Sequence, residues 1–381
     1  MTSIRESMRR LFTPIKPLPA GLYHRQALSG AAYPYRLHLR LDPDGNGALI
    51  VNASTILHLN QTAAEYAYHL IAGTSPERVA QEISRRYRIE RRRASQDFQD
   101  LSQRILTLAN TTDLDPEMFL DFNRSSPDIA APSIPYRLDC ALTYRLPEGT
   151  NPYFAPLKRV ARELTTQEWI QILDKAWSAG VPHIIFTGGE PYLRDDLAEL
   201  LIHAEENGQV TGLLTDGRIF VDASRLDAIL NTGLDYMLIL LDPAQEQTWE
   251  ALTNLIAADI FIAVHLTLTL QNALEAKDVL VHLSEIGVTR LSLSSADSSL
   301  NNTLADLRNQ AASLSMSLVW DLPVPFSAHN PVALEVQEDA SAEPLHRSSY
   351  YVEPDGDVCQ AQGSDLVLGN LLSDPLESIW Q

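Results

Sequence analysis

The chain has 381 residues, of which 45% are hydrophobic, and its 29 Lys and Arg against 49 Asp and Glu give a net charge of −20. This negative charge disfavours general affinity for nucleic acid or anionic membranes, because a polyanion gains no counterion-release free energy from another polyanion. The two cysteines, Cys140 and Cys359, exclude a disulfide framework, a four-cysteine zinc site and any cluster held by three protein thiolates.

Charge and hydropathy change along the chain. Residues 1–110 hold 15 basic and 9 acidic side chains, whereas the rest holds 14 basic and 40 acidic ones. No apolar run reaches the roughly 18 residues that a membrane span requires, and the first residues lack the apolar core of a secretory signal. We therefore expect two electrostatically distinct parts, no membrane segment and a cytoplasmic location.

The first part of the chain has the pattern of a small α+β domain. Alternating apolar residues predict short strands within residues 35–59. A first helix begins after Asn60 or Thr62, and two more helices follow up to Leu108. This order predicts a winged-helix-like α+β domain. Residues 111–135, which are rich in Asp, Pro and Ser, then read as a linker.

From Tyr136 onward, short apolar runs alternate with helical periods. The six expected strands, each with the helix after it, are Tyr136–Leu142 with Thr165–Ser178, His183–Thr187 with Asp195–Asn207, Val210–Thr215 with Ser224–Asn231, Tyr236–Leu241 with Glu246–Ala257, Ile260–Leu268 with Leu274–Ile286, and Arg290–Leu293 with residues 299–312. Six such units predict an α/β fold with a parallel sheet, either curled as a partial barrel or open and doubly wound. In both architectures ligands bind where the strands end, so the residues after each strand are the functional candidates.

The second of these strands ends in Gly188-Gly189-Glu190-Pro191. Two glycines after a strand let the backbone come close to a ligand, and Glu190 supplies an acceptor for an ammonium group. Taken alone, such a short sequence more often forms a tight turn that leads into a helix. The surrounding motifs are therefore needed to decide between the two interpretations.

Three further short motifs follow in order: Thr215-Asp216-Gly217, Leu241-Asp242, and Thr267-Leu268-Thr269 with Asn272. With these motifs the segment resembles the radical S-adenosylmethionine (SAM) superfamily, whose partial barrel uses a GGEP sequence after its second strand to meet the amino group of SAM. The resemblance implies a partial (β/α)6 TIM-like barrel over residues 136–325. It also implies a SAM site at Gly188, Gly189, Glu190 and Pro191.

Both flanks resemble parts of peptide-modifying members of this superfamily. Residues 52–108 are similar to the PqqD-type domain that holds leader peptides, which implies a peptide-recognition domain over residues 1–110. Val352–Cys359 and Leu368–Leu371 resemble the start of a SPASM or twitch extension, which binds auxiliary clusters in relatives. We expect residues 326–381 to be a short, truncated form of this C-terminal extension.

Arginines at the end of the second helix, Arg85, Arg86 and Arg88, form a candidate peptide-binding surface. Guanidinium groups form charge-assisted pairs with carboxylates, so these side chains could grip an acidic peptide. The same side chains also suit a solvated helix end, contacts with phosphates, or docking on the chain's own acidic half.

The main departure from the superfamily concerns its CxxxCxxC motif, whose three thiolates ligate a [4Fe–4S] cluster. The aligned stretch begins at Cys140, and Tyr144 and Pro147 occupy the other two ligand positions. Cys140 is then the only remnant of the motif, and a buried cysteine in an apolar strand is its simpler interpretation. We therefore expect no metal site and no iron–sulfur cluster, while SAM stays a cofactor that the site can hold.

These observations favour a protein of peptide maturation with radical SAM ancestry that has lost radical catalysis. It would bind or present a peptide substrate or leader peptide beside an intact radical SAM partner. One alternative is an active radical SAM peptide-modifying enzyme with an atypical iron–sulfur site. A second alternative makes residues 1–110 a nucleic-acid-binding module, although the overall charge speaks against nucleic acid as a partner.

Overall fold

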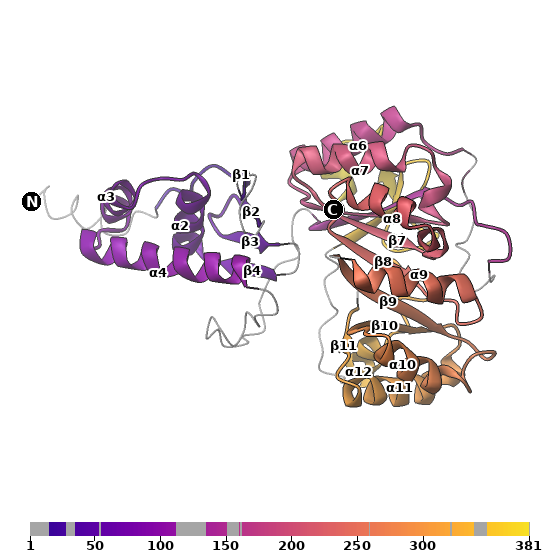
Figure 1. Cartoon of the computed structure of the whole chain (residues 1–381). Coiled ribbons are helices and arrows are strands. Elements are labelled where there is room, and N and C mark those ends of the chain that lie inside the picture. The colour runs from indigo at the N-terminus through magenta and orange to yellow at the C-terminus, as the bar shows by residue number, and fades with distance from the viewer. Residues whose placement is uncertain are drawn as a thin grey trace, which may run out of the picture. The chain divides into compact units, whose positions relative to one another are not determined.

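The chain divides into two units, residues 1–128 and residues 129–381, which are described separately (Figure 1). The structure is a computed structural model, and it describes residues 15–27, 35–52, 55–111, 135–150, 160, 162–258, 260–320, 322–338 and 349–380. The expected linker, residues 111–135, lies almost wholly outside these ranges. None of the described helices has both the length and the apolar character that a bilayer crossing requires.

The N-terminal unit has a four-stranded antiparallel sheet in the order β1-β2-β3-β4. Its elements are β1 (Gly21–Gln26), β2 (Arg36–Leu41), β3 (Gly47–Val51), β4 (Thr55–Leu59), α2 (Gln61–Ile71), α3 (Pro76–Tyr87) and α4 (Arg91–Asn110). Asn60 caps α2, because its side chain accepts a hydrogen bond from the Ala63 amide. The expected strands and helices are present, and β1 is an additional strand that the sequence pattern did not predict.

The second unit contains a ten-stranded sheet in the order β11-β10-β9-β8-β7-β6-β5-β12-β13-β14. The strands are β5 (Arg137–Thr143), β6 (His183–Gly188), β7 (Val210–Thr215), β8 (Tyr236–Leu240), β9 (Phe261–Leu268), β10 (Arg290–Ser295), β11 (Ser317–Leu318), β12 (Ser349–Val352), β13 (Asp357–Cys359) and β14 (Val367–Asn370). All neighbouring pairs from β11 to β12 are parallel. The described strands leave the sheet with two ends, so it forms no closed barrel. The α/β prediction is confirmed.

Of the described helices of this unit, the first six follow the strands as the sequence predicts, whereas the last two are additional. They are α6 (Thr166–Ala179), α7 (Leu197–Asn207), α8 (Ala223–Leu230), α9 (Glu246–Ala257), α10 (Ala276–Glu285), α11 (Asn301–Ser313), α12 (Pro331–Glu338) and α13 (Leu376–Ile379). The first of them begins with a capping box, in which Thr165 and Glu168 each accept a hydrogen bond from the other's backbone amide. It ends at Gly180, which has φ 95°.

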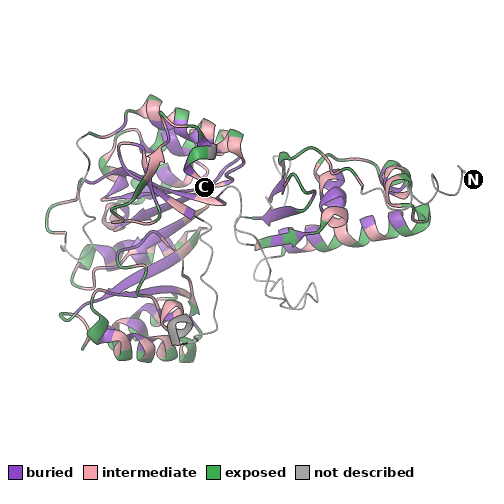
Figure 2. Ribbon diagram, turned by 180° about the vertical axis from the view of Figure 1, so that it is seen from behind, coloured by how far each residue is buried: buried purple, intermediate pink, exposed green. Residues whose placement is uncertain are grey.

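The two faces of the parallel sheet bury different partners. Side chains at alternate positions, such as Leu138 and Phe186, pack against the helices in the larger core. The intervening positions, such as Ile185 and Leu214, pack instead with Val324, from the segment after β11. Figure 2 shows buried residues concentrated along the strands, with exposed residues on the outer faces of the helices. A strand residue therefore packs against the helices or against the segment after β11, depending on the face of the sheet on which it lies.

Candidate functional site

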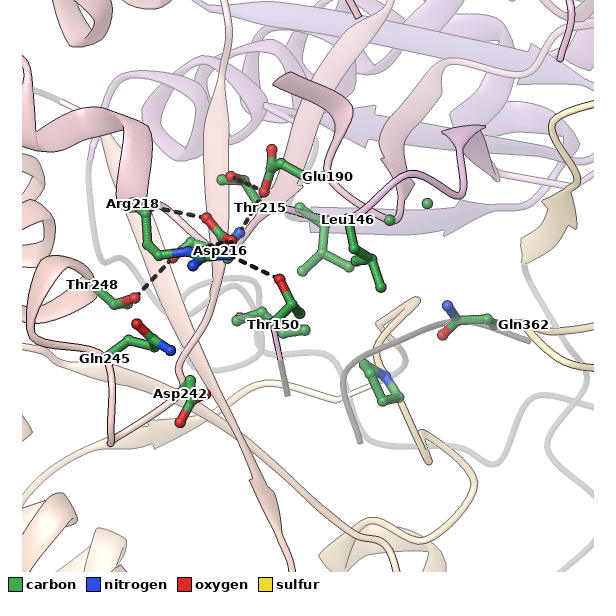
Figure 3. A pocket seen from close by; sticks show the side chains of 15 residues that line it. Leu146, Thr150, Glu190, Thr215, Asp216, Arg218, Asp242, Gln245, Thr248 and Gln362 are labelled. Atoms are coloured by element: carbon green, nitrogen blue, oxygen red, sulfur yellow. Dashed lines mark hydrogen bonds and ion pairs between the residues drawn. The ribbon is translucent and has the colours of Figure 1, made fainter. Parts of the chain in front are cut away.

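A pocket lies where β6, β7 and β8 end (Figure 3). Its cavity volume is about 30 Å³, enough for one or two water molecules, and a surrounding space of about 560 Å³ includes open solvent. The residues that line it and matter below are Gly188, Gly189 and Glu190 after β6, Thr215, Asp216 and Arg218 after β7, Leu240, Asp242 and Gln245 at and after β8, Leu146 and Thr150 after β5, and Gln362. The pocket is thus where a parallel α/β sheet is expected to bind ligands.

Three of the four residues expected to bind SAM line this pocket. Gly188, Gly189 and Glu190 contribute to its wall, whereas Pro191 is buried at the start of the short helix η2 (Pro191–Leu193). Leu240 lines the pocket, whereas Tyr144 does not. The cavity next to the glycines has room for only one or two water molecules.

The two glycines permit a close contact between backbones. A Cβ on Gly188 would lie 2.2 Å from the carbonyl oxygen of Thr143, and one on Gly189 would lie 2.1 Å from that of Arg145. In this space the Gly189 amide donates to Thr143 O over 2.6 Å and the Glu190 amide to Arg145 O over 2.9 Å. The glycines thus fasten the end of β6 to the segment after β5, as well as opening the backbone towards the pocket.

The Glu190 side chain joins the ends of β6 and β7. Its Oε1 accepts from the Tyr192 amide at 3.0 Å, and its Oε2 accepts from Thr215 Oγ1 at 2.8 Å and the Asp216 amide at 2.9 Å. Only 4% of the residue is exposed, and burial, with the charge of Asp216, raises its pKa to about 8. Three donors of the chain thus engage this buried carboxyl group, which is largely protonated at neutral pH.

A polar side chain ties the loop after β5 to the end of β7. Arg218 lies in the short helix η3 (Arg218–Val221) and forms an ion pair with Asp216, with 2.7 Å between Nη2 and Oδ2. Its Nη2 also donates to Thr150 Oγ1 at 2.9 Å, and its Nη1 to Glu148 O at 3.3 Å. Figure 3 shows the three side chains side by side on the pocket wall. Gln245 adds a second tie, because its Nε2 donates to Gly149 O at 3.3 Å.

Cys140 is placed away from the pocket. It lies in the middle of β5, is fully buried and packs in the same core as Leu138 and Leu142, on the helix-covered face. Burial raises the pKa of its thiol above the ordinary value, which disfavours the thiolate that metals bind. Cys359, in β13, is also fully buried. Among the residues that the structure describes, no three His, Cys, Asp or Glu are grouped so that they could hold a metal ion.

The other two positions of the expected cluster alignment are also outside the pocket. Tyr144 is buried against Tyr351, and its hydroxyl donates to the carboxylate of Glu353. Neither Tyr144 nor Pro147 is among the lining residues. The alignment that begins at Cys140 therefore places none of its three positions at the site that the glycine motif forms.

The three arginines of the candidate peptide-binding surface differ in their surroundings. Arg86 forms an ion pair with the buried Glu65, with 2.6 Å between Nε and Oε1, and also donates to Lys16 O. It therefore fastens α3 to α2. Arg85 and Arg88 are exposed, and Arg88 ends α3 with a left-handed backbone, φ 55°. Only these two present largely exposed side chains for binding.

The sequence interpretation missed Arg218, Thr150 and Gln245 as site residues. Arg218 directly follows the Thr215-Asp216-Gly217 motif, so its place after a strand was a usable signal. Thr150 and Gln245 carry no motif. Their place in the pocket depends on how the loop after β5 folds back, which the sequence pattern does not reveal.

Comparisons with known proteins agree with this architecture. Residues 140–257 match the sequence profile of the Radical SAM superfamily. Over 127 residues the chain is 32% identical to a PqqA peptide cyclase from Granulibacter bethesdensis, and the match covers 32% of this chain and 33% of the cyclase. The chain thus matches about a third of the length of this curated relative.

Solved structures show the same fold. Streptococcus suis SuiB bound to the precursor peptide SuiA has a TM-score of 0.58 and 15% identity, with 90% of this chain and 86% of that chain covered. The protein anSMEcpe with bound AdoMet has a TM-score of 0.51 and 13% identity, with 65% and 80% covered. The resemblance to the radical SAM superfamily is therefore confirmed in sequence over residues 140–257, and the solved structures share the fold over most of the chain.

A Gly189→Ala substitution should destabilise the second unit strongly. The added Cβ would meet the Arg145 carbonyl at 2.1 Å, and overpacking of this kind typically costs about 1–3 kcal/mol, so we expect a loss of about 3 kcal/mol of unfolding free energy. Gly149→Ala is the control, because nothing lies within 4 Å of its Cβ position and only its positive φ is strained. Urea unfolding measures both. Equal losses for the two variants would contradict the proposed close contact.

An Arg218→Ala substitution should loosen the loop after β5. The variant loses the hydrogen bonds from the guanidinium group to Thr150 and Glu148, so cleavage after Glu148 by a glutamyl endopeptidase should become several-fold faster. The matched control is Arg225→Ala, an exposed arginine on α8. If both variants are cleaved at the wild-type rate, Arg218 does not hold the loop.

A Glu190→Gln substitution should change how stability depends on pH. Because the pKa of Glu190 rises from 4.5 to about 8 on folding, the folded chain binds this proton more tightly than the unfolded chain. The wild type therefore loses unfolding free energy through this group as the pH rises through that range. We would measure the unfolding free energy of both proteins in urea at pH 4.5 and at pH 8. From the lower to the higher pH, the stability of the variant relative to the wild type should increase. A constant difference would contradict the raised pKa.

Proposed function

We propose that this chain, whose residues 140–257 are a radical SAM domain, acts in peptide maturation by binding or presenting a peptide and does not generate a radical. The observation that carries the proposal is the absence of a thiol from the described wall of the pocket. Cys140 faces the helices and Cys359 lies in β13, both fully buried. A [4Fe–4S] cluster needs thiolate ligands, so the described residues do not fit one.

SAM is the cofactor that the resemblance implies at this pocket. Gly188, Gly189 and Glu190 line it, and SAM binding requires the wall to open beyond the water-sized cavity of this structure. A structure of Streptococcus suis SuiB with bound S-adenosylmethionine has the same fold, with a TM-score of 0.56. We propose that this chain has kept the capacity to bind SAM without the reductive chemistry that a cluster supplies.

The peptide role rests on the N-terminal unit and on the fold of the relatives. We propose that residues 1–110 are a PqqD-like peptide-recognition domain, followed by the linker 111–135, the barrel 136–325 and the extension 326–381. The fold similarity to SuiB, solved with a precursor peptide, covers 90% of this chain. Arg85 and Arg88 supply exposed cations for an acidic peptide segment. We propose an intact radical SAM enzyme as the partner that modifies the bound peptide.

Anaerobic reconstitution with iron and sulfide tests the loss of the cluster. We expect less than one iron per chain after desalting and no visible charge-transfer absorption, because the pocket offers no thiolate. A reconstituted PqqA peptide cyclase serves as the positive control for the procedure. A stable brown protein with about four irons per chain would contradict the proposal and favour an active enzyme with an atypical cluster site.

Charge reversal at two arginines tests the proposed peptide surface. A fluorescent acidic model peptide should bind the full chain, and the double variant Arg85→Glu with Arg88→Glu should weaken binding about tenfold, because two charge-assisted contacts are lost. The control is Arg225→Glu, which changes charge at an exposed arginine of the other unit. Unchanged affinity in the double variant would show that these two residues do not bind the peptide. Salt-dependent binding of a DNA duplex in place of the peptide would favour the nucleic-acid alternative.

A further inference from the structure

Strand β5 turns Cys140 away from the pocket. Along β5, Leu138, Cys140 and Leu142 pack in the core on the helix-covered face, whereas Ala141 packs with Tyr144 and Tyr351 in a separate cluster. Side chains of a strand alternate between its faces, so Cys140 cannot turn to the pocket without moving its neighbours to the wrong face as well.

Two residues of the loop after β5 do reach the pocket. Leu146 and Thr150 both line it, both are half-buried, and they are four residues apart in the chain. They share the pocket with Gly188 and Glu190, the residues of the glycine motif. A CxxxCxxC motif places its first two ligands four residues apart, so this pair has the spacing and the location that the first two thiolates require.

We propose that Leu146 and Thr150 occupy the positions of the first two cluster ligands, so that no cysteine of the motif survives in this chain. The spacing alone puts the third position at Tyr153, which lies outside the described residues. Cys140 is then an ordinary core residue of β5 and not a remnant of the motif. The inference rests on the proposed function, since it assumes that the pocket descends from a radical SAM site.

The chemistry at the two positions agrees with a lost metal site. Leucine has no donor atom, and the Thr150 hydroxyl already accepts a hydrogen bond from Arg218 at 2.9 Å. Arg218 and Gln245 also donate to the backbone carbonyls of Glu148 and Gly149, between the two positions. Hydrogen bonds from η3 and from the residue that caps α9 thus hold the loop where metal–sulfur bonds would otherwise hold it.

Restoring thiols in the two competing alignments tests the inference. The triple variant Leu146→Cys, Thr150→Cys, Tyr153→Cys should acquire about four irons per chain and the visible absorption of a [4Fe–4S] cluster on anaerobic reconstitution. The matched control is Tyr144→Cys with Pro147→Cys, which completes CxxxCxxC from Cys140 and should acquire none. Adding Cys140→Ala to the triple variant should leave its iron content unchanged. A folded triple variant without a cluster, or a cluster in the control variant, overturns the inference.

Thiol labelling keeps the inference testable if the triple variant does not fold. The single variants Leu146→Cys and Thr150→Cys should react rapidly with a maleimide in the native chain, whereas the wild type and Tyr144→Cys should be protected, because Cys140, Cys359 and Tyr144 are buried. Protection at both 146 and 150 overturns the inference.

The same reconstitution separates the two proposals. A cluster in the wild-type chain contradicts the proposed loss of catalysis. A wild-type chain and a folded triple variant that both lack a cluster contradict only the assignment of Leu146 and Thr150.

Discussion

The pocket depends on the close approach of two backbone segments, the end of β6 and the stretch after β5. The amide of Gly189 donates to Thr143 O, and no side chain fits between them, since a Cβ at Gly189 would lie 2.1 Å from the Arg145 carbonyl. This contact sets the position of Glu190, whose carboxyl group then joins the end of β7. Contacts within the backbone therefore form the wall of the site, and no bound cofactor is needed to hold it together.

The loop after β5 is the second element on which the site depends. Arg218 and Gln245 hold this loop through hydrogen bonds that they donate to it. Such an arrangement lets the loop fold without metal and retains a pocket beside Gly188. The proposed loss of the redox centre leaves these contacts in place, as the proposed peptide-binding role beside an active partner requires.

Much of the barrel could be predicted from local signals. The capping box at Thr165 and the glycine end at Gly180 frame α6, and the apolar periods locate the six strands within two residues. The pairing of β12 with β5 could not be predicted, because it joins residues far apart in sequence. The alignment at Cys140 placed no expected ligand position in the pocket for a similar reason. Spacing alone does not show on which face of β5 a side chain lies. Cys140 is buried in the helix-facing core, so it does not lie at the pocket.

The central claim is that this chain does not cleave SAM reductively. The most direct measurement is the formation of 5′-deoxyadenosine from SAM by the full chain, reconstituted anaerobically and reduced with dithionite. The account predicts no 5′-deoxyadenosine above the level of a protein-free control, with and without an added peptide. Formation of 5′-deoxyadenosine with turnover, lost on chelation of iron, would contradict the account and show that the chain assembles a working cluster by a route other than its pocket residues.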